Sequence, residues 1–275
     1  MEKLSSGYNP DNNVKNLFDL RGKIALISGA SFGGLGYYYA EAFVEAGAKV
    51  AISDISSRSK DLEIAFKKLV DIGGDVRAYE LNVSNEKSVK TCMKEISKDF
   101  GRLNILLNNA GVTFRKEALQ MELDEWKKVI ETNLTGTWLI DREVAGLMIK
   151  NGYSRGGRII NVSSQLGKVA GKFPESSYYA SKAGIINLTR ALAKEWGQFG
   201  INVNCIAPGL FYPTNMTETI SEDSRMFQSL ADRTLKGRFG NPAKDLKGIS
   251  VFLASEASEY ITGQTIFVDG GWTAW

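Results

Sequence analysis

Two polar side chains four residues apart, Tyr178 and Lys182, are the first sign of chemistry in this sequence. On a helix, residues at positions i and i+4 lie on the same face, one turn apart. A free tyrosine titrates near pH ~10 and exchanges protons poorly at neutral pH, whereas a neighbouring ammonium favours the ionised phenol. We therefore expect Lys182 to lower the pKa of Tyr178. Taken alone, such a pair more often marks the edge of a core beside a solvated charge.

A serine strengthens this interpretation. Ser164 stands fourteen residues before Tyr178, just after the apolar run 158–162. A strand that ends in a serine and a helix that carries tyrosine and lysine can place three polar groups around one small carbonyl. The chain contains no histidine, which excludes His-based triads and His general bases. Its two cysteines, Cys92 and Cys205, are too few for a structural zinc site, so we expect no metal.

A glycine-rich segment, residues 28–36, separates a predicted strand from a predicted helix. Its glycines, from Gly29 to Gly36, let the backbone approach a pyrophosphate, and the helix N-terminus offers free N–H groups. The same pattern also fits a plain strand–helix turn. Its position in the first strand–helix–strand unit favours a dinucleotide site.

The expected cofactor is NAD, in preference to NADP. Asp54 ends the second predicted strand, where a carboxylate can accept hydrogen bonds from ribose hydroxyls and would repel a 2′-phosphate. Neither Ile55 nor Phe32 supplies a cation there. The alternative is that Asp54 only starts a surface turn, and Arg58 is near enough in sequence to swing towards a phosphate.

Short apolar runs alternate with longer helical patterns along the chain. We predict strands over 23–28, 49–53, 76–81, 104–107, 158–162, 201–206 and 265–268, and helices over 35–46, 59–72, 86–100, 123–150, 177–199 and 243–254. This alternation predicts an α/β fold: a single-domain, Rossmann-type, doubly wound seven-stranded parallel sheet with helices on both faces. Ligands of such sheets bind beyond the carboxyl ends of the strands.

The predicted domain spans residues 17–275, preceded by a loose N-terminal arm over 1–16. The irregular stretch 210–238 follows the sixth strand, and we interpret it as a lid over the substrate, with an ordinary surface loop as the alternative.

Composition narrows the class of protein. The 275 residues are 43% hydrophobic and 24% charged, with a net charge of +3, which is typical of a soluble globular protein. No basic stripe predicts nucleic-acid binding, and no apolar run reaches the ~20 residues of a membrane span. The first twenty residues lack the apolar core of a signal peptide, so we expect a cytoplasmic protein with buried thiols.

The helices over 123–150 and 177–199 are apolar on more than one face, which predicts a homo-oligomer, most simply a homotetramer.

Taken together, the motifs resemble the short-chain dehydrogenase/reductase family over roughly residues 20–275. The matching residues are Gly29 to Gly36, Asp54, Asn108 to Gly111, Asn133, Ser164, Tyr178, Lys182 and Pro208-Gly209, in the family's order. The segment Leu17 to Leu20 and the ending at Trp272 are similar to sugar-acid and polyol members of the gluconate 5-dehydrogenase type.

The resemblance implies roles for the catalytic residues. Tyr178 would be the general acid–base, Ser164 would orient the substrate oxygen, and Lys182 would bind the nicotinamide ribose. Asn133 would position a water in a proton relay. The cofactor would be bound by Gly29, Ser31, Phe32, Gly34, Leu35, Gly36, Asp54, Asn82, Val83, Asn109, Ala110, Gly111, Tyr178, Lys182, Pro208, Gly209 and Thr214.

Ser164 matches the family's serine better than Ser163 does. Tyr179 has Ala183, not lysine, four residues on, so it lacks the partner of a catalytic tyrosine.

The chain departs from the family pattern at several points. The glycine loop is one residue longer than usual, which leaves open whether Gly33 or Gly34 meets the phosphate. Ser28 replaces the common threonine, and Asn82 replaces a frequent aspartate near the adenine. The spacing from Ser164 to Tyr178 is also one residue longer, which suggests a different substrate loop.

The sequence thus predicts an NAD(P)-dependent oxidoreductase that interconverts a secondary alcohol and a ketone. A small hydroxylated substrate, such as a sugar acid, a polyol or a cyclic ketone, suits the expected pocket residues Phe114, Gln165, Leu166, Phe173, Phe211, Tyr212 and Met216. Arg115 and Lys168 are candidates for binding a carboxylate. Two alternatives remain on the same fold: a non-catalytic dinucleotide sensor or scaffold, and a dehydratase or epimerase.

Overall fold

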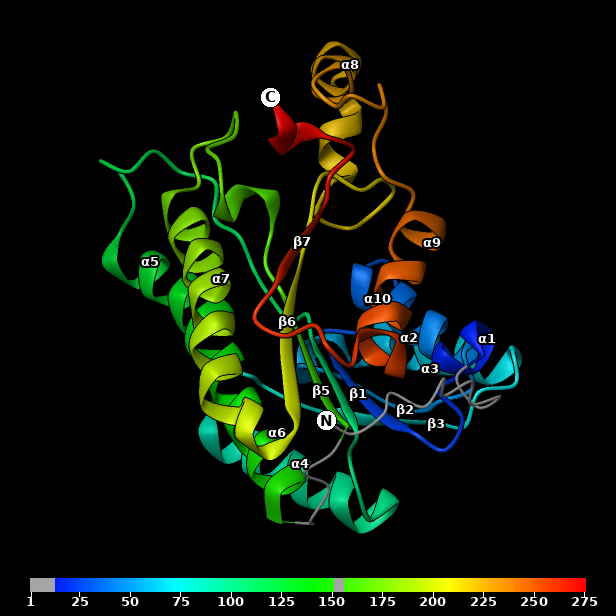
Figure 1. Cartoon of the computed structure of the whole chain (residues 1–275). Coiled ribbons are helices and arrows are strands. Elements are labelled where there is room, and N and C mark those ends of the chain that lie inside the picture. Colours follow the sequence, from blue (N-terminus) through cyan, green and yellow to red (C-terminus); the bar gives the residue numbers. More distant parts are fainter. Residues whose placement is uncertain (1–12, 151–155) are drawn as a thin grey trace, which may run out of the picture.

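A seven-stranded parallel sheet forms the centre of the structure, a computed structural model that describes residues 13–150 and 156–275 (Figure 1). The strand order is β3-β2-β1-β4-β5-β6-β7, and every pair is parallel. The strands are β1 (Ile24–Ser28), β2 (Lys49–Asp54), β3 (Val76–Glu80), β4 (Ile105–Asn108), β5 (Gly157–Val162), β6 (Ile201–Pro208) and β7 (Thr265–Val268). The predicted doubly wound sheet is confirmed. The order reverses between β1 and β4, where sheets of this kind open a crevice for ligands.

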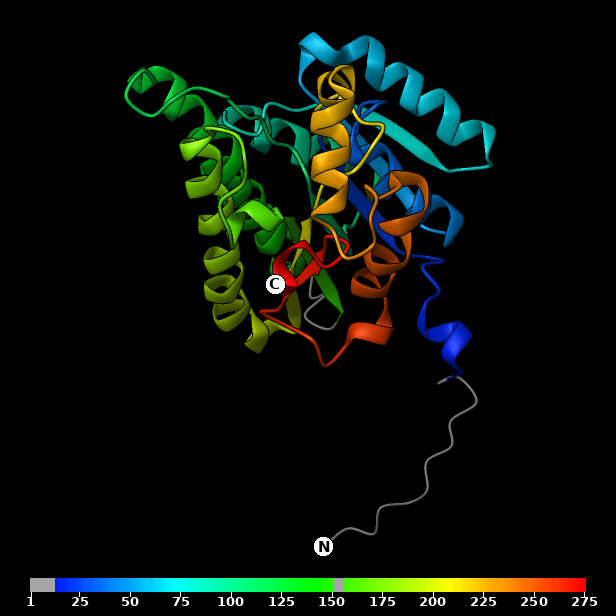
Figure 2. The ribbon, with the colours of Figure 1, turned by 90° about the horizontal axis from the view of Figure 1, so that it is seen from above.

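Helices cover both faces of the sheet, as the two views show (Figures 1 and 2). On one face lie α2 (Leu35–Glu45), α3 (Ser59–Asp71) and α10 (Lys247–Ala254). On the other lie α4 (Glu86–Phe100), α6 (Gly136–Lys150) and α7 (Ser176–Trp196). The apolar strands are therefore buried on both sides, which explains why their sequences read as continuous apolar runs.

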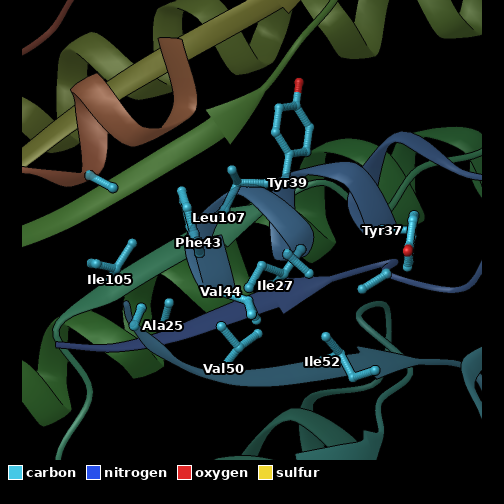
Figure 3. Close-up of a cluster of buried hydrophobic side chains, with 14 of the residues drawn as sticks. Ala25, Ile27, Tyr37, Tyr39, Phe43, Val44, Val50, Ile52, Ile105 and Leu107 are labelled. Atoms are coloured by element: carbon cyan, nitrogen blue, oxygen red, sulfur yellow. The ribbon is translucent and has the colours of Figure 1, made fainter. Parts of the chain in front are cut away.

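Strand β1 shows how one strand serves two cores. Alternate side chains point to opposite faces, so Ala25 and Ile27 join the cluster beneath α2 (Figure 3). Ile24 and Leu26 join the cluster beneath α4 and α6. Phe43 of α2, fully buried, packs on the first cluster.

Two predicted helices are interrupted. The region 123–150 consists of α5 (Leu123–Ile130), a π-helical turn η3 (Glu131–Thr135) and α6. The region 243–254 divides into α9 (Pro242–Asp245) and α10, with Leu246 between them. Single π turns inside helices often occur at functional sites, and Asn133 lies in this one.

The start of the domain and the predicted lid are also visible. Of the predicted arm 1–16, residues 1–12 lie outside the described residues, whereas Val14–Leu17 form the short helix α1, capped by the Asn13 side chain. The stretch 210–238 contains the 3-10 turn η6 (Glu218–Glu222) and α8 (Ser224–Asp232), which lies beyond the carboxyl end of β6 (Figure 1). Within the described ranges, none of the helices has the length and apolar character needed to span a membrane.

A buried polar network lies between the sheet and the helices α6 and α7. Asp141 of α6 is fully buried, and its two carboxylate oxygens accept hydrogen bonds from the side-chain amides of Asn108 (3.3 Å) and Asn161 (2.9 Å). Asn161 continues the network to Thr189 of α7 (3.2 Å). Burial raises the pKa of Asp141 to about 7, because desolvation of the carboxylate outweighs the two hydrogen bonds that lower it.

Replacement of Asp141 by Asn should change how stability depends on pH. An unfolded aspartate titrates near ~3.9, so between that pH and about 7 the folded protein holds a proton that the unfolded chain has released. The stabilisation from this site is complete below the unfolded pKa and is lost as the pH rises through the folded one. The test is urea unfolding of both proteins across this pH range. The free energy of unfolding of the wild type minus that of D141N should fall by up to ~4 kcal/mol between about pH 4 and about pH 8. A constant difference over this range would contradict the prediction.

Candidate active site

A cavity of about 850 Å³ opens at the carboxyl ends of the strands. It is lined by the segments that follow β1, β2, β4, β5 and β6, represented by Gly34, Asp54, Ala110, Ser164 and Gly209. The cavity therefore lies at the crevice where the topology predicts a ligand.

Tyr178, Ser164 and Lys182 converge in this cavity. Tyr178 and Lys182 come from the first turns of α7, and their side chains are almost fully buried. The Ser164 hydroxyl, at the end of β5, is hydrogen-bonded to the Tyr178 phenol. The Lys182 ammonium lies over the Tyr178 ring, 5.5 Å from its centroid, and donates to the Val162 carbonyl at 2.9 Å.

The neighbouring serine and tyrosine are engaged elsewhere. The Ser163 hydroxyl donates to the backbone carbonyl of Lys182 at 2.7 Å and so anchors α7 to β5. The Tyr179 hydroxyl donates to the Phe173 carbonyl and accepts from the Gly171 N–H. Tyr179 thus fastens the loop that precedes α7.

The prediction that Lys182 lowers the pKa of Tyr178 is wrong for this structure. Burial raises the pKa of Tyr178 to about 12, and the Ser164 hydrogen bond, which acts in the opposite direction, only partly offsets it. Burial also lowers the pKa of Lys182 to about 8. Both shifts have the same cause, since removal from water disfavours the charged form of each group.

Asn133 lies beside the cavity rather than on its surface. Its side chain exchanges two hydrogen bonds with the backbone of Val112 (2.8 and 2.9 Å) and donates to the Ser181 hydroxyl (3.0 Å). It therefore ties the loop after β4 to α7, the helix that carries Tyr178 and Lys182. A Cβ at Gly111 would lie 3.3 Å from Asn133 Oδ1 and 3.4 Å from Lys182 Nζ, so the loop packs closely against both residues.

Most of the predicted cofactor residues line the cavity. These are Gly29, Gly34, Leu35, Asp54, Asn82, Val83, Asn109, Ala110, Gly111, Tyr178, Lys182, Pro208, Gly209 and Thr214. The lining does not include Ser31, Phe32 or Gly36. A Cβ at Gly36 would lie 2.2 Å from the Gly29 carbonyl oxygen, so this glycine allows α2 to pack on the loop. Ser31 is buried, and its N–H donates to Asp54 at 3.2 Å.

The longer glycine loop contacts the stretch 210–238 through Gly33. Gly33 adopts a positive φ of 83°, and its carbonyl accepts the N–H of Asn215 at 2.8 Å. A Cβ at Gly33 would lie 2.3 Å from the Asn215 side chain, so this contact requires glycine. Gly34, the N-cap of α2, lines the cavity.

The substrate end of the cavity matches the predicted pocket in part. Gln165, Leu166, Phe173, Phe211 and Met216 line it, whereas Phe114 and Tyr212 do not. Lys168, one of the two candidates for a carboxylate, is also outside the lining, because its ammonium lies over the Phe267 ring and donates to the Thr273 carbonyl.

An ion pair that the sequence did not reveal lies at this end. Arg115 Nε donates to Glu175 at 2.9 Å, and the other oxygen of Glu175 accepts from the Thr113 hydroxyl at 2.9 Å. The Glu175 side chain is only 4% exposed, compared with 32% for Arg115, whose guanidinium stacks over Phe173. An acidic residue just before a helix is a recognisable signal, but nothing in the sequence pairs it with Arg115.

Residues 29–273 match a family model described as enoyl-(acyl carrier protein) reductase. The chain is 37% identical to 2-dehydro-3-deoxy-D-gluconate 5-dehydrogenase of Dickeya dadantii, over 95% of this chain and 99% of that protein. It belongs to the short-chain dehydrogenase/reductase family. It is therefore an oxidoreductase that acts on CH–OH and keto groups.

Two further relatives differ in their named activities. A 3-oxoacyl-[acyl-carrier-protein] reductase of Thermotoga maritima is 38% identical and covers 92% of this chain and 98% of its own. The crystal structure of a gluconate 5-dehydrogenase from Burkholderia cenocepacia, in complex with NADP and tartrate, has a TM-score of 0.88 at 32% identity. It covers 96% of this chain and all of the matched one.

Proposed function

We propose that the chain interconverts a secondary alcohol and a ketone with a nicotinamide dinucleotide, using Tyr178 as the general acid–base. The observation that carries the proposal is the Tyr178 phenol, hydrogen-bonded to Ser164 and adjacent to the Lys182 ammonium inside the cavity. Glu175 is also buried at the cavity, but its carboxylate oxygens already accept hydrogen bonds from Arg115 and Thr113, so Tyr178 is the better candidate for proton transfer.

The residues present fit a dinucleotide. Gly34 and Leu35 place the N-terminus of the 11-residue helix α2 at the cavity, where free N–H groups favour an anion. Asp54 lies at the end of β2 on the same cavity and suits a ribose diol. Lys182 supplies a donor for a second ribose. When bound, the nicotinamide would accept or deliver the hydride.

Residues of the chain itself would transfer the proton to or from the substrate oxygen. Since the pKa of Tyr178 is raised to about 12, the phenol holds its proton at neutral pH and can donate it from Oη to a developing alkoxide. Ser164 Oγ orients the substrate oxygen. Asn133 holds the loop at Val112 against Ser181 and so fixes the spacing between that loop and α7. The role of Asn133 in positioning a water for a proton relay stays a prediction.

Tyr178→Phe should lower kcat by ~10²-fold or more, because the ring still packs but the proton donor is lost. Binding of NADH, measured by its fluorescence, should be nearly unchanged. Tyr179→Phe is the matched control, since Tyr179 does not line the cavity and its hydroxyl bonds to the Phe173 backbone carbonyl. Retention of more than about a tenth of kcat in Y178F would contradict the assignment. A wild type that bound NADH but turned over none of the alcohols and ketones tested would instead favour the non-catalytic scaffold.

We also propose a preference for NAD, which Asp54 supports. Its carboxylate is fixed by the N–H groups of Ser31 and Ile55, so its charge remains at the cavity edge. The related gluconate 5-dehydrogenase was solved with NADP, so the preference rests on this residue alone. The value of kcat/KM should be tenfold or more higher with NAD, since one unfavourable charge contact of ~1.4 kcal/mol gives that ratio. Equal use of NADP would refute the preference.

We propose a hydroxy acid, of the size of a sugar acid, as the substrate. Arg115 is the cation at the substrate end, and Glu175 fixes its Nε. Two relatives are named as dehydrogenases of gluconate or a gluconate derivative, which agrees with a sugar-acid substrate. The third is named as a 3-oxoacyl-[acyl-carrier-protein] reductase, so an acyl-carrier-protein thioester is the alternative substrate. A dehydratase or epimerase would show turnover without a change in absorbance at 340 nm.

Arg115→Gln should lower kcat/KM for a sugar acid by about 10²-fold, because a charge-assisted hydrogen bond to a carboxylate contributes roughly 1.5–3 kcal/mol. A neutral polyol should lose much less. Lys116→Gln is the matched control, since Lys116 pairs with Glu125 and does not line the cavity. An equal loss for acid and polyol would show that Arg115 only supports the fold.

The domain limits, assembly and location also stay predictions. We propose residues 17–275 as one domain with 210–238 as its lid, a homotetramer and a cytoplasmic location. Trp138 of α6 is 39% exposed, which supports a subunit interface on that helix, and light scattering would test it.

A further inference from the structure

Arg58 is a cation at the cavity edge that carries Asp54. It ends the 3-10 turn η2 (Ser56–Arg58), which follows β2, and both residues line the cavity. A guanidinium in this position could bind the 2′-phosphate that distinguishes NADP from NAD. Where the guanidinium points therefore matters for the choice between the two cofactors.

The guanidinium is held by Asp61, in the first turn of α3. Arg58 Nε and Nη2 donate to Asp61 Oδ2 at 3.2 and 3.0 Å, and Nη2 also donates to the Phe32 carbonyl at 3.3 Å. Among the described residues, Arg58 forms its ion pair with Asp61 and not with Asp54.

The backbone of Asp61 fixes the same arrangement. Its carbonyl accepts the Phe32 N–H at 3.1 Å, which holds the glycine loop against the start of α3. The Arg58 carbonyl accepts the Ser31 hydroxyl at 3.4 Å. Hydrogen bonds therefore fix both the backbone carbonyl and the side chain of Arg58, and the guanidinium points towards the glycine loop.

We propose that Asp61 is a specificity-determining residue for the cofactor: it positions Arg58 against the Phe32 carbonyl and so withholds a cation from the 2′-phosphate. The inference rests on the proposed dinucleotide site. Arg58 and Asp61 are 32% and 47% exposed, and an ion pair with this exposure is weak enough for a phosphate dianion to compete.

The test measures binding of small adenosine ligands by calorimetry, without turnover. Adenosine 2′,5′-bisphosphate carries the 2′-phosphate, and 5′-AMP lacks it. Asp61→Asn removes the partner of Arg58 while keeping the side-chain shape. Glu63→Gln is the matched control, because Glu63 lies in the same helix and forms a surface ion pair with Lys67. Arg58→Gln and the double variant D61N/R58Q show whether any gain depends on Arg58.

We expect D61N to bind the bisphosphate more tightly, relative to 5′-AMP, by up to about fivefold, because an exposed ion pair contributes at most about 1 kcal/mol. E63Q should leave the ratio at the wild-type value, and D61N/R58Q should lose the gain. An unchanged ratio in D61N, or a gain that survives in D61N/R58Q, would overturn the inference while leaving the dinucleotide site intact. Failure of the wild type to bind 5′-AMP would instead overturn the proposed dinucleotide site, and the inference with it.

Discussion

The site depends on how the ends of β1 and β4 are held together. The Ser28 hydroxyl donates to the Asn108 side chain at 2.9 Å and accepts the N–H groups of Asn109 and Ala110 at 3.0 and 3.1 Å. The Asn109 amide in turn donates to the Gly29 carbonyl at 2.8 Å. These bonds join two loops at the point where the strand order reverses, so that the crevice required by the topology has fixed walls. Serine performs this role as threonine would, since only the hydroxyl is used.

Burial is the second constraint, because it sets the charge states on which catalysis depends. Burial raises the pKa of Tyr178 and lowers the pKa of Lys182, so each side chain favours its neutral form. In such a site, a nearby charge has a larger effect than it would have in water. Glu175 raises the pKa of Tyr178, whereas Arg115 lowers it. A substrate carboxylate that bound Arg115 would therefore also change the field at the phenol. In the proposed function, substrate binding and proton transfer would therefore be coupled through this pair.

The sequence predicted what depends on local pattern. The seven strands follow from apolar runs separated by helical periodicity, and Asp54 and Ser164 follow from their places at strand ends. It could not predict contacts between distant segments: Glu175 with Arg115, or Gly33 with Asn215, each joins parts of the chain whose proximity only the fold creates. The pKa of Tyr178 was mispredicted for a related reason. A sequence shows that a lysine is one turn away, but it does not show how little water surrounds the pair.

One carbonyl group links the two ends of the cavity. Phe32 O accepts from Arg58 Nη2 at 3.3 Å and from the Asn215 side chain at 3.4 Å, so the glycine loop contacts both the η2 turn and the lid. Asn215 makes a second bond to the loop through Gly33. In the adjoining part of the lid, Met216 and Thr217 line the cavity. These bonds therefore connect the Asp54 end of the cavity with the stretch 210–238, the proposed lid. The longer glycine loop supplies this connection, because without Gly33 the lid would lose both the carbonyl and the space that Asn215 occupies.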